Sequence, residues 1–428
     1  MQRLQLVVVG NGMAGVRTLE ELLAAAPERY DITVFGAEPH PNYNRILLSP
    51  VLSGEAKPAE IELNGLDWYW SHGIRLHLGK RIARIDRRRR FVIAADGTEA
   101  PYDRLLLATG SNPVMLPIAG CGLAGVSTYR DFTDTGEMIG AAARYRRAVV
   151  IGGGLLGLEA ANGLRARGME VTVVHVMPWL MERQLDEEAA NLLRGALEAR
   201  GIAFRLSART TDLVPGRDGR VGAVALADGT HLPAELVVMA VGIRPNIELA
   251  QQAGLHCERG IVVSDTMQSF DPRIYAVGEC VAHRGVAYGL VEPLYEMAKV
   301  CATHLAGSGI GRYAGSIPST RLKVTGIDLF SAGDFMGTPG TEAITLRDPS
   351  GIYRKVILKD GQVAGALLYG DTEGAAWLLG LMREKRDISA IRDVLAFGPE
   401  AVAKLKSEES PPSAPLPVAT GAAERRVA

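Results

Sequence analysis

The feature that most constrains the fold is a glycine-spaced turn directly after the first apolar run of the chain. Residues 4–9 read Leu-Gln-Leu-Val-Val-Val, which is typical of a parallel strand that is buried on both faces. Gly10, Gly12 and Gly15 follow, and residues 16–26 have helical periodicity. Glycines at this spacing give a tight turn, let the backbone approach a pyrophosphate and let the helix pack closely on the strand. The pattern therefore predicts a dinucleotide at the N-terminus of this helix.

A second strand and an acidic residue follow in the order expected of a nucleotide-binding motif. Residues 31–35 are predicted to form the strand, and Glu38 comes after it. Its separation from Gly15 is close to the roughly 20 positions expected of a carboxylate that binds a ribose 2′-hydroxyl. A lone Gly-x-Gly-x-x-Gly also occurs in ordinary tight turns, but the full series of strand, glycines, helix, strand and acid favours dinucleotide binding.

The same series recurs in the middle of the chain. An apolar run over residues 148–151 leads into Gly-Gly-Gly-Leu-Leu-Gly-Leu-Glu at 152–159, and a strand is predicted over 170–174. His175 then stands where the first motif has an acid. A carboxylate would favour the ribose 2′-hydroxyl of NAD, whereas a 2′-phosphate favours cations. His175, with Arg183 nearby, leaves NADH and NADPH as open alternatives.

Two dinucleotide-binding motifs in one chain predict two dinucleotides. A flavoprotein that transfers hydride needs this pairing, with FAD in the first motif and a nicotinamide nucleotide in the second. The predicted fold class is α/β, with two Rossmann-like dinucleotide-binding domains and a C-terminal α+β interface domain. We expect a discontinuous FAD-binding domain over residues 1–118 and 248–318, an NAD(P)H-binding domain over 119–247, the interface domain over 319–405 and a disordered tail over 406–428.

Shorter patterns fill out these domains. Residues 105–113 form a predicted strand ending in small residues, which would let the backbone approach a cofactor. Residues 235–242 are predicted to close the second sheet and residues 243–246 to form a turn. Antiparallel strands are expected over 328–335 and 340–366, and two helical stretches follow over 373–383 and 387–397. This C-terminal part makes a homodimer a plausible assembly.

Three polar residues have open alternatives. Arg45 could pair with a phosphate, lie beside a flavin ring, or be a solvated loop arginine. Glu279, at the end of a predicted strand, could accept a hydrogen bond from the ribityl hydroxyls of FAD or be a polar strand end. Glu159 is at most a positioning residue, because hydride transfer needs alignment more than acid–base chemistry.

Composition excludes several other classes. The formal net charge is −1, which gives no reason to expect nucleic-acid binding. The sequence shows no signal-peptide pattern and no run of about 18 apolar residues, so we expect a cytoplasmic protein without a membrane segment. The four cysteines lie far apart without a Cys-x-x-Cys, which argues against a zinc site, an iron–sulfur cluster or a dithiol centre.

The order of these motifs resembles the two-dinucleotide flavoprotein reductases of the pyridine nucleotide-disulfide oxidoreductase superfamily. More narrowly, it resembles the N-terminal FAD/NAD(P)H module of assimilatory nitrite reductase large subunits and the electron-transfer subunit of assimilatory nitrate reductases. The likeness covers about residues 1–405. It is carried by residues 10–13, 43–49, 108–110, 152–159, 242–245 and 278–280, and more specifically by 181–186, 289–291 and 369–372.

The resemblance implies two sets of cofactor-binding residues. The predicted FAD contacts are Gly10, Gly12, Met13, Ala14, Gly15, Glu38, Arg45, Ser49, Ile82, Ala108, Thr109, Gly110, Gly278 and Glu279. The predicted NAD(P)H contacts are Gly152, Gly154, Leu155, Leu156, Gly157, Glu159, His175, Arg183 and Gly242.

One departure from the resemblance bears on the electron acceptor. The full nitrite reductase subunit continues into cysteine-bearing segments that hold iron–sulfur clusters and sirohaem, and this sequence ends before them. The expectation is a reductase that feeds a separate iron–sulfur, sirohaem or molybdenum protein.

Rival functions remain at this point. Dithiol chemistry of the glutathione-reductase type would need a cysteine pair after the first motif, and residues 43–53 contain no cysteine. The same absence weakens a single-cysteine NADH peroxidase or oxidase. A ferredoxin or rubredoxin reductase shares every dinucleotide motif. A flavin-binding redox sensor is the alternative that is not an enzyme.

Overall fold

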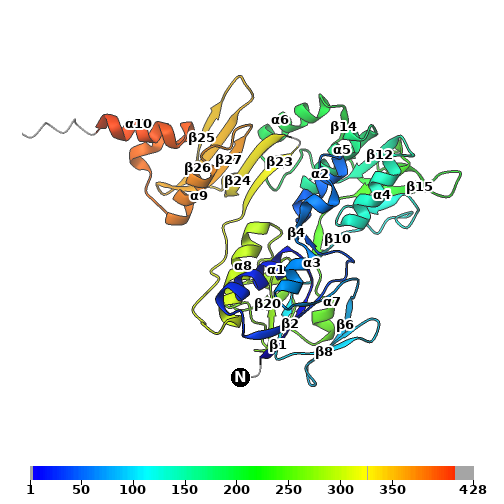
Figure 1. Ribbon diagram of the computed structural model, residues 1–428. Helices are drawn as coiled ribbons and strands as arrows, with labels where there is room; N and C mark the ends of the chain where they lie inside the picture. The colour runs from blue at the N-terminus through cyan, green and yellow to red at the C-terminus, as the bar shows by residue number, and fades with distance from the viewer. Residues whose placement is uncertain (1–2, 325, 410–428) are drawn as a thin grey trace, which may run out of the picture. The chain divides into compact units, whose positions relative to one another are not determined.

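Two parallel sheets with the same arrangement of strands form the centre of residues 1–333 in the computed structural model, which describes residues 3–324 and 326–409 (Figure 1). In the first sheet, β1 pairs in parallel with β2 on one side and β9 on the other. The side chains of residues 6–9 are at most 6% exposed, so both faces of β1 are covered. The strand order is β21 (Ile274–Ala276), β9 (Arg104–Leu107), β1 (Leu4–Val9), β2 (Tyr30–Phe35) and β5 (Arg75–His77).

The helix after the first glycine turn begins earlier than predicted. α1 spans Met13–Ala25, and Gly12 is its N-cap. The expected start at Val16 is wrong by one turn because the glycine motif itself supplies the first helical residues. α1 packs against α8 (Val291–Leu305), a helix far along the chain.

The second sheet repeats the first. β12 lies at its centre and pairs in parallel with β13 and β18. The strand order is β11 (Val126–Thr128), β18 (Leu236–Met239), β12 (Arg147–Ile151), β13 (Glu170–Val174) and β14 (Ile202–Arg205). Its helices are α4 (Phe132–Ala142), α5 (Leu155–Ala166) and α6 (Glu187–Glu198). In both sheets the glycine turn follows the central strand, where parallel α/β sheets bind ligands.

A helix from the first half of this region packs on the second sheet's glycine helix. α2 (Leu48–Ser53) contacts α5, and Figure 1 draws the two side by side. A Cβ on Gly163 of α5 would lie 2.6 Å from Cγ of Leu52, so only glycine allows this approach. Arg167 donates hydrogen bonds to the carbonyls of Leu52 and Val51 at the end of α2. The contact therefore joins α2, which follows the first nucleotide-binding motif in the chain, to the helix that begins at the second glycine turn.

Short strands, most of them paired antiparallel, and short helices complete this region, and β20 and β22 pair in parallel. Residues 243–246 were predicted to form a turn, but Ile243–Pro245 is a short strand, β19, paired with β10 (Ser111–Pro113). The other strands are β3 (Asn42–Tyr43), β4 (Glu62–Asn64), β6 (Ile82–Asp86), β7 (Phe91–Ala94), β8 (Glu99–Pro101), β15 (Thr210–Pro215), β16 (Val221–Leu226), β17 (His231–Pro233), β20 (Ile261–Val263), β22 (Val281–His283), β23 (Ser319–Val324) and β24 (Ile327–Gly333). The short helices are η1 (Arg45–Leu47), η2 (Pro58–Ile61), α3 (Leu66–Ser71) and α7 (Glu248–Gln252).

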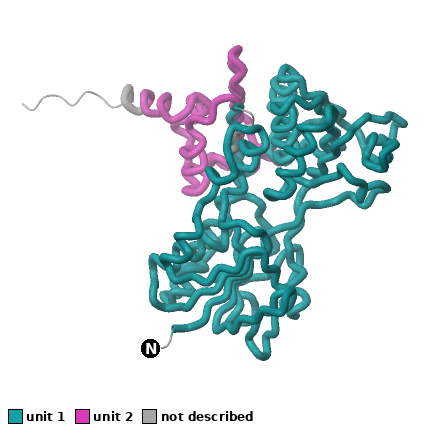
Figure 2. The backbone as a smooth tube through the Cα atoms, turned by 45° about the vertical axis from the view of Figure 1, so that its right-hand side comes forward, with its two compact units in different colours: residues 1–333 teal, residues 334–428 magenta. Residues whose placement is uncertain are grey.

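The described residues from 334 to 409 belong to a second compact unit of the chain (Figure 2). Its strands β25 (Glu342–Arg347), β26 (Tyr353–Lys359) and β27 (Gln362–Tyr369) are antiparallel, as predicted. α9 (Ala375–Glu384) confirms the first expected helix, and η3 (Ser389–Phe397) is a 3-10 helix. The domain boundaries expected from the sequence stay a prediction.

One helix lies partly where a tail was expected. α10 spans Pro399–Glu409, whereas disorder was predicted from residue 406. Proline at the first helical position and Glu400 in the first turn are helix-start signals that the tail's composition obscured. Residues 410–428 of the predicted tail lie outside the described residues. Among the helices of the described residues, none is both long and apolar enough to cross a membrane.

Candidate functional site

The first glycine turn packs against the end of β9 and leaves one side open. Gly10 has a φ of +113°, and a Cβ on it would lie 2.1 Å from the carbonyl oxygen of Ala108. A Cβ on Gly15 would lie 2.9 Å from the Cβ of Ala108. Gly12 differs, because no described protein atom lies within 4 Å of its Cβ position and no described side chain caps α1 there. The backbone N–H groups at this helix start thus face open space, as a pyrophosphate site requires.

The second glycine turn has the same geometry. A Cβ on Gly152 would lie 2.2 Å from the carbonyl oxygen of Ala240, and a Cβ on Gly157 would lie 1.9 Å from the carbonyl oxygen of Gly152. Gly154 again has no described protein atom within 4 Å of its Cβ position and is the N-cap of α5. The residues therefore fit a dinucleotide at each turn.

Glu38 forms the first link in a chain of polar contacts beside the first turn. It follows β2, and its carboxylate accepts hydrogen bonds from the Tyr43 hydroxyl at 2.7 Å and from Arg45 at 2.5 Å. The Arg45 guanidinium also donates to the carbonyl oxygen of Arg130 at 2.7 Å and lies 5.0 Å from the ring centre of Tyr43. Arg45 is therefore a bridging residue, and the alternative of a solvated loop arginine does not describe it.

Arg130 continues this chain to Glu279. Its guanidinium forms an ion pair with Oε2 of Glu279, and both side chains are less than 20% exposed. The hydroxyl of Ser111 donates to the same oxygen at 2.7 Å. Arg130 was missed from the sequence because β11, the strand before it, has only three residues. Its place between that strand and α4, at the carboxyl end of a parallel strand, is the signal that could have found it.

The segment after β9 is held by Asn246. The Thr109 hydroxyl donates to the carbonyl oxygen of Asn246 at 2.6 Å, and the Asn246 amide donates back to the Thr109 carbonyl at 3.3 Å. The backbone N–H of Asn246 donates to the carbonyl oxygen of Gly110 at 2.8 Å. Thr109 and Gly110 are thereby fixed next to the first glycine turn, and Asn246 is a second residue that sequence reasoning missed.

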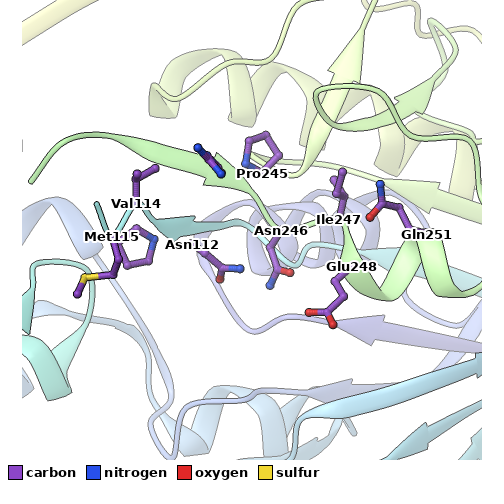
Figure 3. Close-up of a pocket in the computed structure, with 10 residues that line it drawn as sticks. Asn112, Val114, Met115, Pro245, Asn246, Ile247, Glu248 and Gln251 are labelled. Atoms are coloured by element: carbon purple, nitrogen blue, oxygen red, sulfur yellow. The ribbon is translucent and has the colours of Figure 1, made fainter. Parts of the chain in front are cut away.

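An open pocket of about 280 Å³ lies beside Asn246, on the paired strands β10 and β19 (Figure 3). Residues of β10, β19 and α7 line it, including Asn112, Asn246, Glu248 and Gln251. None of the predicted cofactor residues lines this pocket, so it is separate from the two glycine turns.

The remaining predicted FAD contacts divide into two groups. Met13 and Ala14 begin α1, and a Cβ on Gly278 would lie 3.1 Å from the Cβ of Ala14, so the end of β21 reaches the start of α1. Ile82, in contrast, is 7% exposed and belongs to the hydrophobic core. Any contact of Ile82 with a cofactor would therefore come from its backbone.

The predicted NAD(P)H contacts are also spread out. Leu155 and Leu156 are the first two residues of α5, beside the second turn. His175 is buried directly after β13. Arg183 and Gly242 are exposed, and Gly242 has a φ of +112°. The turn and His175 thus come together, while no described contact joins Arg183 to them.

Glu159 lies where α5 contacts α2. It belongs to α5, close to Ser49 of α2, and burial raises the pKa of its carboxyl to about 7 although the Ser49 hydroxyl acts in the opposite direction. The Ser49 hydroxyl lies 3.2 Å from the hydroxyl of Tyr129. Burial also raises the pKa of Tyr129 well above its usual range. Glu159 is therefore a half-buried acid whose pKa lies well above that of a free carboxyl.

Substitution of Gly12 by alanine tests the first turn. The added methyl meets no described protein atom, so the free energy of unfolding without nucleotide should change by less than about 0.5 kcal/mol. FAD affinity, measured by titration calorimetry, should fall about tenfold because the methyl occupies the pyrophosphate's approach. Gly10→Ala is the contrasting variant and should destabilise the nucleotide-free protein by about 2 kcal/mol. Equal effects of the two substitutions on that stability would contradict this geometry.

Burial of Glu159 predicts a pH-dependent stability. Because its pKa is raised to about 7 in the folded chain, its stabilising contribution is present below the unfolded value of 4.5 and is lost as pH rises through 7. Relative to wild type, Glu159→Gln should gain about 1–3 kcal/mol in unfolding free energy at alkaline pH and little at acidic pH. Denaturant titrations at both pH values measure this difference. A pH-independent difference would show that the carboxyl is not buried in this way.

Two family models match the chain. The pyridine nucleotide-disulphide oxidoreductase model covers residues 4–303, and the model of the rubredoxin NAD+ reductase C-terminal domain covers residues 318–386. A ferredoxin reductase of known structure from Rhodopseudomonas palustris is 28% identical, with a TM-score of 0.78 over 86% of this chain and 91% of that one.

Two relatives from Bacillus subtilis match almost the whole chain. A nitrite reductase [NAD(P)H] is 49% identical over 93% of this chain and 49% of its own length. An assimilatory nitrate reductase electron transfer subunit is 45% identical over 91% of this chain and 50% of its own length. The chain thus spans about half the length of these relatives. On its matched residues and its fold, the chain belongs to the pyridine nucleotide-disulphide oxidoreductase family, whose members bind FAD and NAD(P)H.

Proposed function

We propose that this chain takes electrons from NAD(P)H and passes them through FAD to a separate redox protein of nitrite or nitrate reduction. The observation that carries the proposal is the repeated geometry of the two glycine turns, and the contact of α2 with α5, the helix of the second turn, supports it. When bound, the flavin supplies both two-electron acceptance of a hydride and one-electron release.

The residues of this chain have separate parts in that function. The open N-terminus of α1 would hold the FAD pyrophosphate, and Glu38 has a carboxylate for the ribose hydroxyls. The open N-terminus of α5 would hold the pyrophosphate of NAD(P)H. Glu159 lies on α5 beside α2 and would position the nicotinamide rather than exchange a proton in the reaction.

The choice of acceptor rests on the relatives. The two B. subtilis proteins are named for nitrite and nitrate reduction, and they favour an iron–sulfur, sirohaem or molybdenum partner. The match of residues 318–386 to a rubredoxin reductase domain, and the R. palustris ferredoxin reductase, support a small iron–sulfur protein as the second candidate.

Anaerobic titration of the FAD-bound protein with NADH and with NADPH tests the hydride step. The flavin absorbance should bleach within seconds with at least one nucleotide, because the chain has a site for each dinucleotide and α2 contacts the helix of the second site. A flavin that stays oxidised with both nucleotides would contradict the reductase function and favour a flavin-binding redox sensor.

Reconstitution with purified acceptors tests the partner. The chain should support NAD(P)H-dependent nitrite or nitrate reduction when combined with the matching reductase, and it should reduce a rubredoxin or ferredoxin more slowly. Heat-treated chain with the same acceptors is the control. Rapid rubredoxin reduction without any nitrite or nitrate turnover would reject the proposed partner and support the second candidate.

A further inference from the structure

We propose that Glu182, held in place by His175, recognises the adenosine ribose 2′-hydroxyl of the nicotinamide nucleotide and makes this chain select NADH over NADPH. The inference rests on the proposed function, because it assigns a role at its second nucleotide site. Directly after β13, the sequence has His175 in place of the acid expected at the end of this strand.

The hydrogen bonds of His175 define which of its ring nitrogens carries the proton. Its Nδ1 lies 3.1 Å from the backbone nitrogen of Gly153 and accepts that N–H. A backbone N–H can only donate, so Nδ1 has no proton, and in the neutral ring the proton is on Nε2. Nε2 lies 3.1 Å from Oε2 of Glu182 and donates to it. His175 therefore connects the glycine turn to a carboxylate.

Glu182 is the part of this pair that a ligand can reach. The side chain of His175 is 8% exposed, whereas that of Glu182 is 25% exposed. The imidazole is thus covered, and the carboxylate is the acceptor that faces solvent at this strand end. An ionised carboxylate has about four lone-pair sites, so the bond from His175 leaves capacity for the hydroxyls of a ribose.

The backbone around Glu182 is fixed to the second glycine turn. The N–H of Met181 donates to the carbonyl oxygen of Gly153 at 3.0 Å, and Leu180 and Met181 are at most 1% exposed. A Cβ on Gly153 would lie 2.8 Å from both His175 and Leu180, so the turn and this loop are in close contact. Because the adenosine ribose is bonded directly to the pyrophosphate, a group locked to this turn is within its reach.

The charged groups near this strand end make Glu182 the residue that decides between NADH and NADPH. Residues 176–181 contain no lysine or arginine. Arg183 is exposed beside Glu182, and Arg205 lies at the end of the neighbouring strand β14. These two arginines could attract a 2′-phosphate, but Glu182 would lie against it as a like charge. That repulsion, with the hydrogen bonds lost from the 2′-hydroxyl, predicts discrimination of about tenfold to a hundredfold.

Binding of two nucleotide fragments tests the proposal without hydride transfer. Titration calorimetry on the FAD-bound protein measures the affinity for ADP-ribose and for 2′-phospho-ADP-ribose. Wild type should bind ADP-ribose at least about tenfold more tightly. Glu182→Gln should remove most of that preference, because the amide keeps the shape and loses the negative charge. Glu187→Gln, which removes an exposed acid from the first turn of α6, is the matched control and should keep the wild-type ratio.

The outcomes separate the inference from the proposed function. Equal or tighter binding of the 2′-phosphorylated fragment by wild type would overturn the role of Glu182, and so would an unchanged ratio in Glu182→Gln. Either result can occur while NADPH still bleaches the flavin, which would leave the proposed function intact. Failure of both fragments to bind, together with a flavin that neither nucleotide bleaches, would reject the proposed function itself.

Discussion

The structure depends on two places where one backbone lies too close to another for any side chain. Gly10 approaches the carbonyl of Ala108, and Gly152 approaches the carbonyl of Ala240 in the same way. Each contact fixes the start of a helix against the end of a neighbouring strand, so that an open row of backbone N–H groups results. The distance from the Cβ position to the carbonyl oxygen is 2.1 Å at Gly10 and 2.2 Å at Gly152. A chain with this duplication has two sites for the same kind of ligand.

Polar contacts between segments of the two sheets hold the residues around the first glycine turn in place. Glu38, Arg45, Arg130 and Glu279 come from four separate segments, and their contacts run from the end of β2 to the end of β21. Partly buried ion pairs of this kind add little net stability, but loss of one partner is costly. Their value here is positional, because they hold the residues around the first turn in one arrangement before any nucleotide binds.

The sequence predicts local structure better than the contacts that shape the site. The valine run of β1, the glycine turns and the helices after them follow from periodicity and spacing, and the structure contains them. Arg130 and Asn246 could not be found in this way, since Glu279 lies 149 positions from Arg130 and Thr109 lies 137 positions from Asn246. β19 was read as a turn because a three-residue strand with Pro245 resembles one. Glu182 was not predicted as a site residue, because the role proposed for it depends on a hydrogen bond from His175 that forms only in the folded chain.

A crystal structure with FAD and NAD+ bound is the decisive measurement. We predict one dinucleotide on each glycine turn, with pyrophosphates at the starts of α1 and α5 and the nicotinamide against the flavin beside Glu159. A nicotinamide far from the flavin, or a second glycine turn without any nucleotide, would contradict this prediction. The same structure would show whether the contacts from Glu38 to Glu279 persist when FAD is bound.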